Sequence, residues 1–179
     1  LTDVTGVQTC ALPISEIDEN QLILAAMEVG ADVPVCIECS ASVVTGIGEH
    51  VTPIADFPEL DAVLVNPRVP LTTAKVFAEL GLEPAARLAS PVLGYVSAGS
   101  VRGTIASGRN DLQAAAISVC PQVADCIAAL EGAGATPARM SGSGATCFGL
   151  FDDETAARIA AERVAAANPD WWVRAVTLF

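Results

Sequence analysis

The sequence predicts an α+β fold in which an open sheet is covered by helices on one face. Short apolar runs, such as residues 61–66, alternate along the chain with alanine-rich segments of helical spacing, such as residues 154–167. Glycine, proline and asparagine separate these segments where strands and helices end. Hydrophobic residues make up 52% of the 179 residues, which is enough apolar material for a core. We therefore expect a packed sandwich rather than a disordered chain.

The first elements form a small N-terminal part. Apolar side chains at helical spacing predict a helix that is capped by Ser15 and ended by Gly30. Three extended runs are predicted to follow, over residues 35–40, 42–47 and 51–54. The next stretch is rich in turn residues and is the expected joint, so residues 15–58 and 59–179 are predicted to form separate domains.

The elements of the C-terminal part are predicted from their end signals. Thr72 or Thr73 is expected to cap a helix that ends at Gly81. Asn110 or Asp111 is expected to cap the next helix. The predicted strands are residues 61–66, 138–140, 146–151 and 171–179. The predicted helices are residues 72–80, 110–119, 121–131 and 154–167, and glycines and serines favour a loop over residues 88–108.

A glycine-serine loop lies between two of the predicted strands. It consists of Ser141, Gly142, Ser143, Gly144 and Ala145, called the glycine loop from here on. Its two glycines can adopt positive φ. Successive N–H groups in such a turn can converge on an anion, and the serine hydroxyls add further donors. The loop therefore predicts a phosphate site, with a plain strand connection as the alternative.

Asp32 lies just after the expected end of the first helix at Gly30, and an extended run follows it from Val33. A carboxylate at such a junction can point into a cleft and take part in proton transfer. An ordinary turn aspartate is the alternative interpretation.

Four segments, in one order, resemble the GHMP small-molecule kinase family: residues 30–34, 66–77, 108–112 and 141–145. The resemblance runs from about Ser15 to Phe179. It implies a remnant of the family's N-terminal domain over residues 15–58. A ferredoxin-like α/β sandwich, the family's C-terminal domain, is then implied over residues 59–179.

The resemblance implies transfer of the γ-phosphoryl group of ATP, with Mg²⁺, to a hydroxyl of a small molecule. The implied substrate is 4-diphosphocytidyl-2-C-methyl-D-erythritol, phosphorylated at its 2-hydroxyl in non-mevalonate isoprenoid precursor biosynthesis. Asp32 matches the catalytic aspartate of the family. The glycine loop, Ser141 to Ala145, matches the motif that closes the site near phosphates and substrate. Thr72 and Thr73 match a segment near the cleft and are possible substrate contacts, although capping also explains them.

Two parts that the family carries upstream have no match in these residues. One is a lysine near the N-terminus, and the other is a long glycine-serine loop that holds the triphosphate. Lys75 is the only lysine in the sequence and does not match the family lysine. We therefore expect the C-terminal part of a kinase, with negligible activity by itself. Residues 1–14 resemble translated sequencing adapter and are expected to be non-native, with a divergent N-terminus as the alternative.

Composition limits the classes of partner. A net charge of −12 argues against nucleic acid, whose phosphates need clustered Lys and Arg. No apolar run reaches the length that spans a bilayer, so we expect no membrane partner and a cytoplasmic location. An anionic ligand would need local compensation, for which the candidates are Lys75, Arg102, Arg109 and Arg139.

The six cysteines include Cys36 and Cys39, which have the spacing of a metal or redox pair. In the predicted strand, positions i and i+3 point to opposite faces, and His50 is the only histidine. A tetrahedral zinc site would need four converging ligands. We therefore expect no metal site, and buried thiols in a reducing cytoplasm.

Two other functions remain open at this point. The chain could belong to another GHMP kinase, acting on a sugar, homoserine or a mevalonate derivative. It could instead be a non-catalytic ligand-binding module that keeps the sandwich and has lost the kinase loop. A substrate panel separates the first alternative from the leading hypothesis, and ligand binding without ATP hydrolysis would identify the second.

Overall fold

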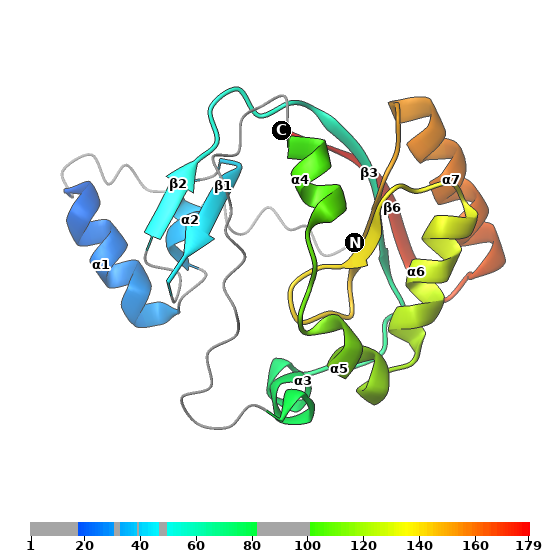
Figure 1. Cartoon of the computed structure of the whole chain (residues 1–179), viewed down its shortest axis with the longest axis horizontal. Helices are drawn as coiled ribbons and strands as arrows, with labels where there is room; N and C mark the ends of the chain where they lie inside the picture. The colour runs from blue at the N-terminus through cyan, green and yellow to red at the C-terminus, as the bar shows by residue number, and fades with distance from the viewer. Residues whose placement is uncertain (1–17, 31–32, 39, 47–49, 82–100) are drawn as a thin grey trace. The chain divides into compact units, whose positions relative to one another are not determined.

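The computed structural model describes residues 18–30, 33–38, 40–46, 50–81 and 101–179. The chain forms two compact units, which divide between Ile54 and Ala55 (Figure 1). The division therefore lies close to the turn-rich joint seen in the sequence, slightly before the domain boundary expected after residue 58.

The first unit contains two helices and a two-stranded antiparallel sheet among its described residues. Its elements are α1 (Glu19–Val29), α2 (Val33–Glu38), β1 (Ser42–Thr45) and β2 (His50–Pro53). β1 and β2 pair with Thr45 opposite His50. The Asp18 carbonyl accepts the first hydrogen bond of α1, from the N–H of Leu22 at 3.0 Å. The expected cap, Ser15, lies outside the described residues.

The prediction of an extended run over residues 35–40 is wrong, because most of that run belongs to α2. Pro34 is the second residue of this helix, where an N–H would have no intrahelical partner, so proline fits there. Cys36 lies in this helix and not in the strand from which its direction was predicted. Cys36 is exposed rather than buried, and Cys39 lies outside the described residues.

The second unit is built on a four-stranded antiparallel sheet in the order β4-β5-β3-β6. The strands are β3 (Leu60–Asn66), β4 (Ala138–Met140), β5 (Cys147–Leu150) and β6 (Trp172–Leu178). The helix α6 (Gln122–Gly132) precedes β4, and α7 (Glu154–Ala167) joins β5 to β6. The resulting βαββαβ order is that of a ferredoxin-like sandwich. The predicted α+β class is therefore confirmed.

The main core lies between the sheet and the helices α6 and α7. The strand register places Cys147 and Val173 on either side of Val65, so the three side chains share one face. All three are buried, together with Leu130 of α6 and Val164 of α7. The alternation of β-branched residues in β3 thus directs valines toward the helices.

Three cysteines of the second unit, Cys120, Cys126 and Cys147, are buried, as expected for core thiols. The pKa of Cys126 is raised, mainly by a hydrogen bond with Cys147 and further by burial. Cys126 therefore stays a neutral thiol and acts as a small apolar side chain.

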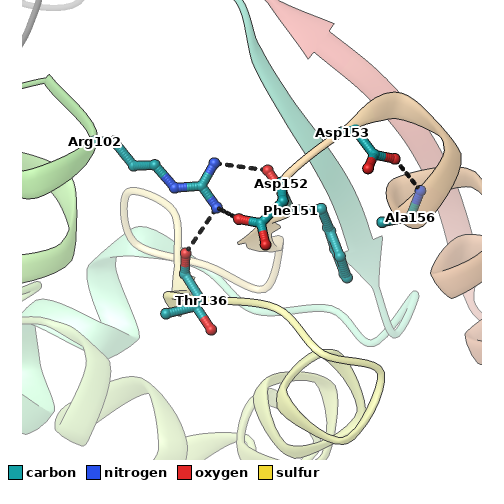
Figure 2. Close-up of polar contacts among 6 residues, drawn as sticks. All are labelled: Arg102, Thr136, Phe151, Asp152, Asp153 and Ala156. Carbon is teal, nitrogen blue, oxygen red and sulfur yellow. Dashed lines mark hydrogen bonds and ion pairs between the residues drawn. The ribbon is translucent and has the colours of Figure 1, made fainter.

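The helix α4 (Val101–Ser107) lies on the other side of the sheet from α6 and α7 (Figure 1). The loop predicted over residues 88–108 is therefore wrong in its last part, and the rest of that segment lies outside the described residues. Arg102 attaches α4 to the end of β5. Its guanidinium donates to the Phe151 carbonyl at 2.7 Å and to the Asp152 carboxylate at 3.0 Å (Figure 2). Tertiary contacts thus support a helix that its local sequence disfavours.

The remaining helices mostly follow their end signals. They are α3 (Thr73–Leu80) and α5 (Gln113–Val119). Thr72 caps α3, because its hydroxyl accepts from the N–H of Lys75 at 3.4 Å, and Gly81 ends the helix with φ of 62°. Asp153 caps α7 by accepting from the N–H of Ala156 at 2.8 Å (Figure 2).

Among the described residues, no single helix is both long enough and apolar enough to cross a membrane. The helices α5 and α6 reach that length and composition only when taken together, and the chain bends by 118° between them.

Candidate functional site

The glycine loop connects β4 to β5 in the second unit. The Ser141 N–H donates to the carbonyl of Thr146 at 2.9 Å, and the Gly144 N–H donates to the Ser141 carbonyl at 3.0 Å. The φ angles are 56° at Gly142 and 88° at Gly144, values that L side chains rarely adopt. The backbone of the turn therefore explains why both positions are glycine.

The two glycines have different surroundings. A Cβ on Gly144 would lie 2.7 Å from the sulfur of Met140 and 3.1 Å from a methyl carbon of Leu71. A Cβ on Gly142 would meet no atom within 4 Å. Ala145 is buried beside Gly144, so this end of the loop packs against the protein, whereas Ser141 and Gly142 at the other end are exposed.

The segment that leads into α3 holds the glycine loop on one side. The hydroxyls of Thr73 and Ser143 lie 2.8 Å apart, although 70 residues separate them in sequence. The Asn66 amide donates to the Thr146 hydroxyl at 2.9 Å, at the point where β5 begins. Thr72 is the helix cap, whereas Thr73 directs its hydroxyl to the loop.

The start of α5 holds the loop on its other side. The Asn110 amide nitrogen donates to the carbonyls of Met140 at 2.9 Å and Gly142 at 2.8 Å. The Gln113 side-chain carbonyl accepts from the N–H of Met140 at 3.0 Å. The expectation that Asn110 or Asp111 caps α5 is wrong: Leu112 occupies the cap position and makes no side-chain capping bond.

Sequence reasoning did not identify Asn66, Asn110 or Gln113 as residues of this site. Asn66 ends β3, and Asn110 and Gln113 lie near the start of α5, so each bond spans at least 27 residues of sequence. A local pattern identifies an asparagine near a helix start as a cap. Asn66 and Asn110 lie in two of the segments that resemble the GHMP kinases, residues 66–77 and 108–112. The occurrence of these segments together with the glycine loop was the sequence feature that could have placed both residues at the site.

An open hollow of about 420 Å³ lies beside the glycine loop. Two arginines line it, Arg109 and Arg139, which were candidates for binding an anion. Arg139 donates to the Ile105 carbonyl at 2.9 Å, at the end of α4. Arg109 pairs with Asp111, whose hydrogen bond and charge raise the pKa of Arg109. Both guanidinium groups are therefore already engaged by protein acceptors.

The other predicted site residues either lie away from the glycine loop or fall outside the residues that the structure describes. Arg102 is bound at the end of β5 (Figure 2). Lys75 is exposed on α3. Asp32, the candidate catalytic residue, lies outside the described residues. Within the described ranges, no three His, Cys, Asp or Glu side chains come together as metal ligands.

Several hydrogen-bond donors lie close together around the loop. The hydroxyls of Thr73 and Ser143 lie together, and Ser141 is exposed at the start of the turn. The structure gives no protein acceptor for the N–H groups of Gly142 and Ser143 within the described part of the chain. Adjacent N–H groups and hydroxyls on a turn of positive φ suit a phosphate group.

This fold and loop are those of a GHMP kinase C-terminal domain. Residues 102–170 match the family model described as GHMP kinases C terminal. The chain belongs to the GHMP kinase family.

Its relatives include proteins that are named 4-diphosphocytidyl-2-C-methyl-D-erythritol kinase. The protein of Nitrobacter winogradskyi is 44% identical over 171 residues, which cover 90% of this chain and 55% of that protein. The protein of Paracoccus denitrificans is 46% identical over 146 residues, which cover 82% of this chain and 54% of that protein. The chain thus spans about half the length of the curated relatives it matches.

Solved structures give the same fold. A crystal structure of 4-(cytidine 5'-diphospho)-2C-methyl-D-erythritol kinase matches with a TM-score of 0.70 and 26% identity, over 96% of this chain and 60% of that one. Homoserine kinase from Cytophaga hutchinsonii matches with a TM-score of 0.69 and 18% identity, over 93% of this chain and 59% of that one. At 18% identity the second match supports the fold alone.

Proposed function

We propose that this chain is part of a kinase that transfers the γ-phosphoryl group of ATP to the 2-hydroxyl of 4-diphosphocytidyl-2-C-methyl-D-erythritol. The observation that carries the proposal is the identity of 44% and 46% to two proteins named for that activity, over 90% and 82% of the chain. The reaction would supply a step of non-mevalonate isoprenoid precursor biosynthesis in the cytoplasm.

In this proposal the glycine loop binds phosphoryl oxygens. The N–H groups of Gly142 and Ser143 would donate to the negatively charged oxygens. The hydroxyls of Thr73 and Ser143 share one hydrogen bond, so the pair would add one further O–H donor beside them. Fixed donors of this kind stabilise the charge that spreads over the transferred group in the transition state. ATP would supply the phosphoryl group, and the loop fits such an anion.

Asp32 is the proposed catalytic carboxylate. It would accept or orient the proton of the substrate hydroxyl while the oxygen attacks phosphorus. We also propose Mg²⁺ as the partner of ATP, but the described residues contain no cluster of metal ligands.

The test of Asp32 uses the full-length gene product with ATP and 4-diphosphocytidyl-2-C-methyl-D-erythritol. Asp32→Ala is expected to lower kcat by about 10²–10⁴-fold, the usual contribution of a general base. The matched control is Asp170→Asn, an exposed carboxylate in the turn before β6, which is expected to leave kcat unchanged. Turnover by Asp32→Ala at the wild-type rate would refute the catalytic assignment.

The substrate class is tested by a panel of acceptors with the same full-length protein. The panel contains 4-diphosphocytidyl-2-C-methyl-D-erythritol, homoserine, mevalonate and a hexose, with ATP consumption and product mass as readouts. The first compound is expected to be phosphorylated with the highest kcat/KM. Phosphorylation of another acceptor in its place would assign a different GHMP kinase activity. Ligand binding without phosphorylation of any acceptor would favour a non-catalytic module.

A further inference from the structure

The side chain of Asn110 joins three backbone groups on two segments. Its amide nitrogen carries two hydrogens, and these bond to the carbonyls of Met140 and Gly142 at 2.9 and 2.8 Å. Its side-chain oxygen accepts from the N–H of Leu112 at 3.0 Å. Both amide hydrogens are therefore used, and the side chain has one orientation that satisfies all three bonds.

These bonds act on the first part of the glycine loop. The carbonyls of Met140 and Gly142 flank Ser141, so one amide group fixes the chain on both sides of that residue. Gln113 adds a bond to the N–H of Met140 at 3.0 Å. A backbone carbonyl that is held in place also fixes the peptide plane that contains the next N–H group. The bond to Gly142 thus sets the direction of the Ser143 N–H.

We propose that Asn110 is a positioning residue, which sets the peptide planes of the glycine loop and thereby aims its N–H donors. Its consequence for catalysis rests on the proposed function, because it requires that the loop bind the transferred phosphoryl group. Its consequence for the loop's conformation does not depend on any activity.

Asn110→Asp tests the proposal with little change of shape. The carboxylate can still accept from the N–H of Leu112, but it cannot donate to the two carbonyls. It would instead place a negative oxygen against them. The matched control is Asn168→Asp at the end of α7, because the Asn168 amide donates to the Val164 carbonyl at 3.0 Å and touches no part of the loop.

The first measurement is amide hydrogen exchange on the 179-residue chain. The Ser141 and Gly144 amides close the turn. They are expected to exchange about tenfold faster or more in Asn110→Asp, because the variant loses hydrogen bonds that hold the loop in place. The amides of Val63 and Val65 in the central strand are expected to keep their wild-type rates. Asn168→Asp is expected to leave the loop amides unchanged.

The second measurement is steady-state kinetics of the same variants in the full-length gene product. Asn110→Asp is expected to lower kcat about 10–100-fold while KM changes little, because misaligned donors weaken the transition state more than the ground state. Asn168→Asp is expected to retain the wild-type kcat.

Two results would overturn the positioning role. One is unchanged exchange of the loop amides in Asn110→Asp. The other is equally faster exchange in the central strand, which would mean a general loss of stability. If the wild-type protein phosphorylates none of the acceptors, the proposed function fails, and faster exchange confined to the loop would still support the role of Asn110.

Discussion

At the residue scale, the two glycines of the loop lead to different expectations for the same substitution. Gly144 has φ of 88°, and a Cβ there would lie 2.7 Å from the sulfur of the buried Met140. Gly142 has φ of 56° and open space around it. Strain of the backbone applies to both positions, whereas overpacking applies only to Gly144.

Gly144→Ala is therefore expected to lower the free energy of unfolding by about 3 kcal/mol, and Gly142→Ala by about 1 kcal/mol. Urea denaturation of the 179-residue chain, followed by tryptophan fluorescence, measures both values. Equal losses would show that Met140 moves away at little cost and that the packing argument for Gly144 is wrong.

Residue types and local order predicted part of this site and missed the rest. Thr72 is the cap that its position before a helix indicated. The glycine loop joins two strands as predicted, with positive φ at Gly142 and Gly144. Asn110 was misread because asparagine near a helix start has a local role by default. Its side-chain oxygen does accept from the nearby Leu112 N–H, but its amide donates to carbonyls 30 and 32 residues away, where no local pattern reaches.

At the element scale, β5 packs closely against α6 at Gly149, which has no side chain. A Cβ on Gly149 of β5 would lie 2.5 Å from the Ala135 Cβ and 3.2 Å from a methyl carbon of Leu130. The Cβ of Ala135 is fixed by its backbone, so a rotamer change cannot relieve that contact. Close packing of β5 under α6 therefore depends on glycine at this position.

Gly149→Ala is expected to lower the free energy of unfolding by about 3 kcal/mol, because the backbone of the strand or of the residues after α6 must shift. The control is Gly132→Ala in α6, where a Cβ meets nothing within 4 Å and alanine favours the helix. The control is expected to be neutral or to stabilise the chain by up to about 1 kcal/mol. Thermal and urea unfolding of both variants provide the comparison, and a neutral Gly149→Ala would contradict it.

Contacts between elements also explain why the sequence predicted some elements and missed others. Hydrophobic spacing and caps predicted the long helix α7 and the strand β3 well, because each carries its own pattern. Propensity failed for α4, whose glycine and serine content disfavours a helix. Arg139 donates to the carbonyls of Ile105 and Ala106 at the end of α4, where a cation also complements the helix dipole. Tertiary contacts of this kind cannot be read from local sequence.

At the scale of the whole molecule, the two units differ in how much structure they can support alone. The strand order β4-β5-β3-β6 pairs segments far apart in sequence, and β3 lies between two partners. Hydrophobic patterning predicted the strands but not their order; the family resemblance implied only the ferredoxin-like sandwich with which this order agrees. The described part of the first unit has a two-stranded sheet, and among its residues whose burial is described only Ala26 and Pro34 are buried. A two-stranded sheet is marginal by itself.

We therefore expect residues 55–179, produced alone, to fold cooperatively, and residues 1–54 to lack a cooperative transition. The second unit keeps its complete four-stranded sheet and the core between that sheet and the helices α6 and α7, so removal of the first unit takes away none of these contacts. Calorimetric melting and amide exchange of the two fragments measure this difference. The core amides of Val63 and Val65 should be protected in residues 55–179 as they are in the whole chain. A fragment 55–179 that melts without a transition would mean that contacts of the first unit are needed to stabilise the sandwich.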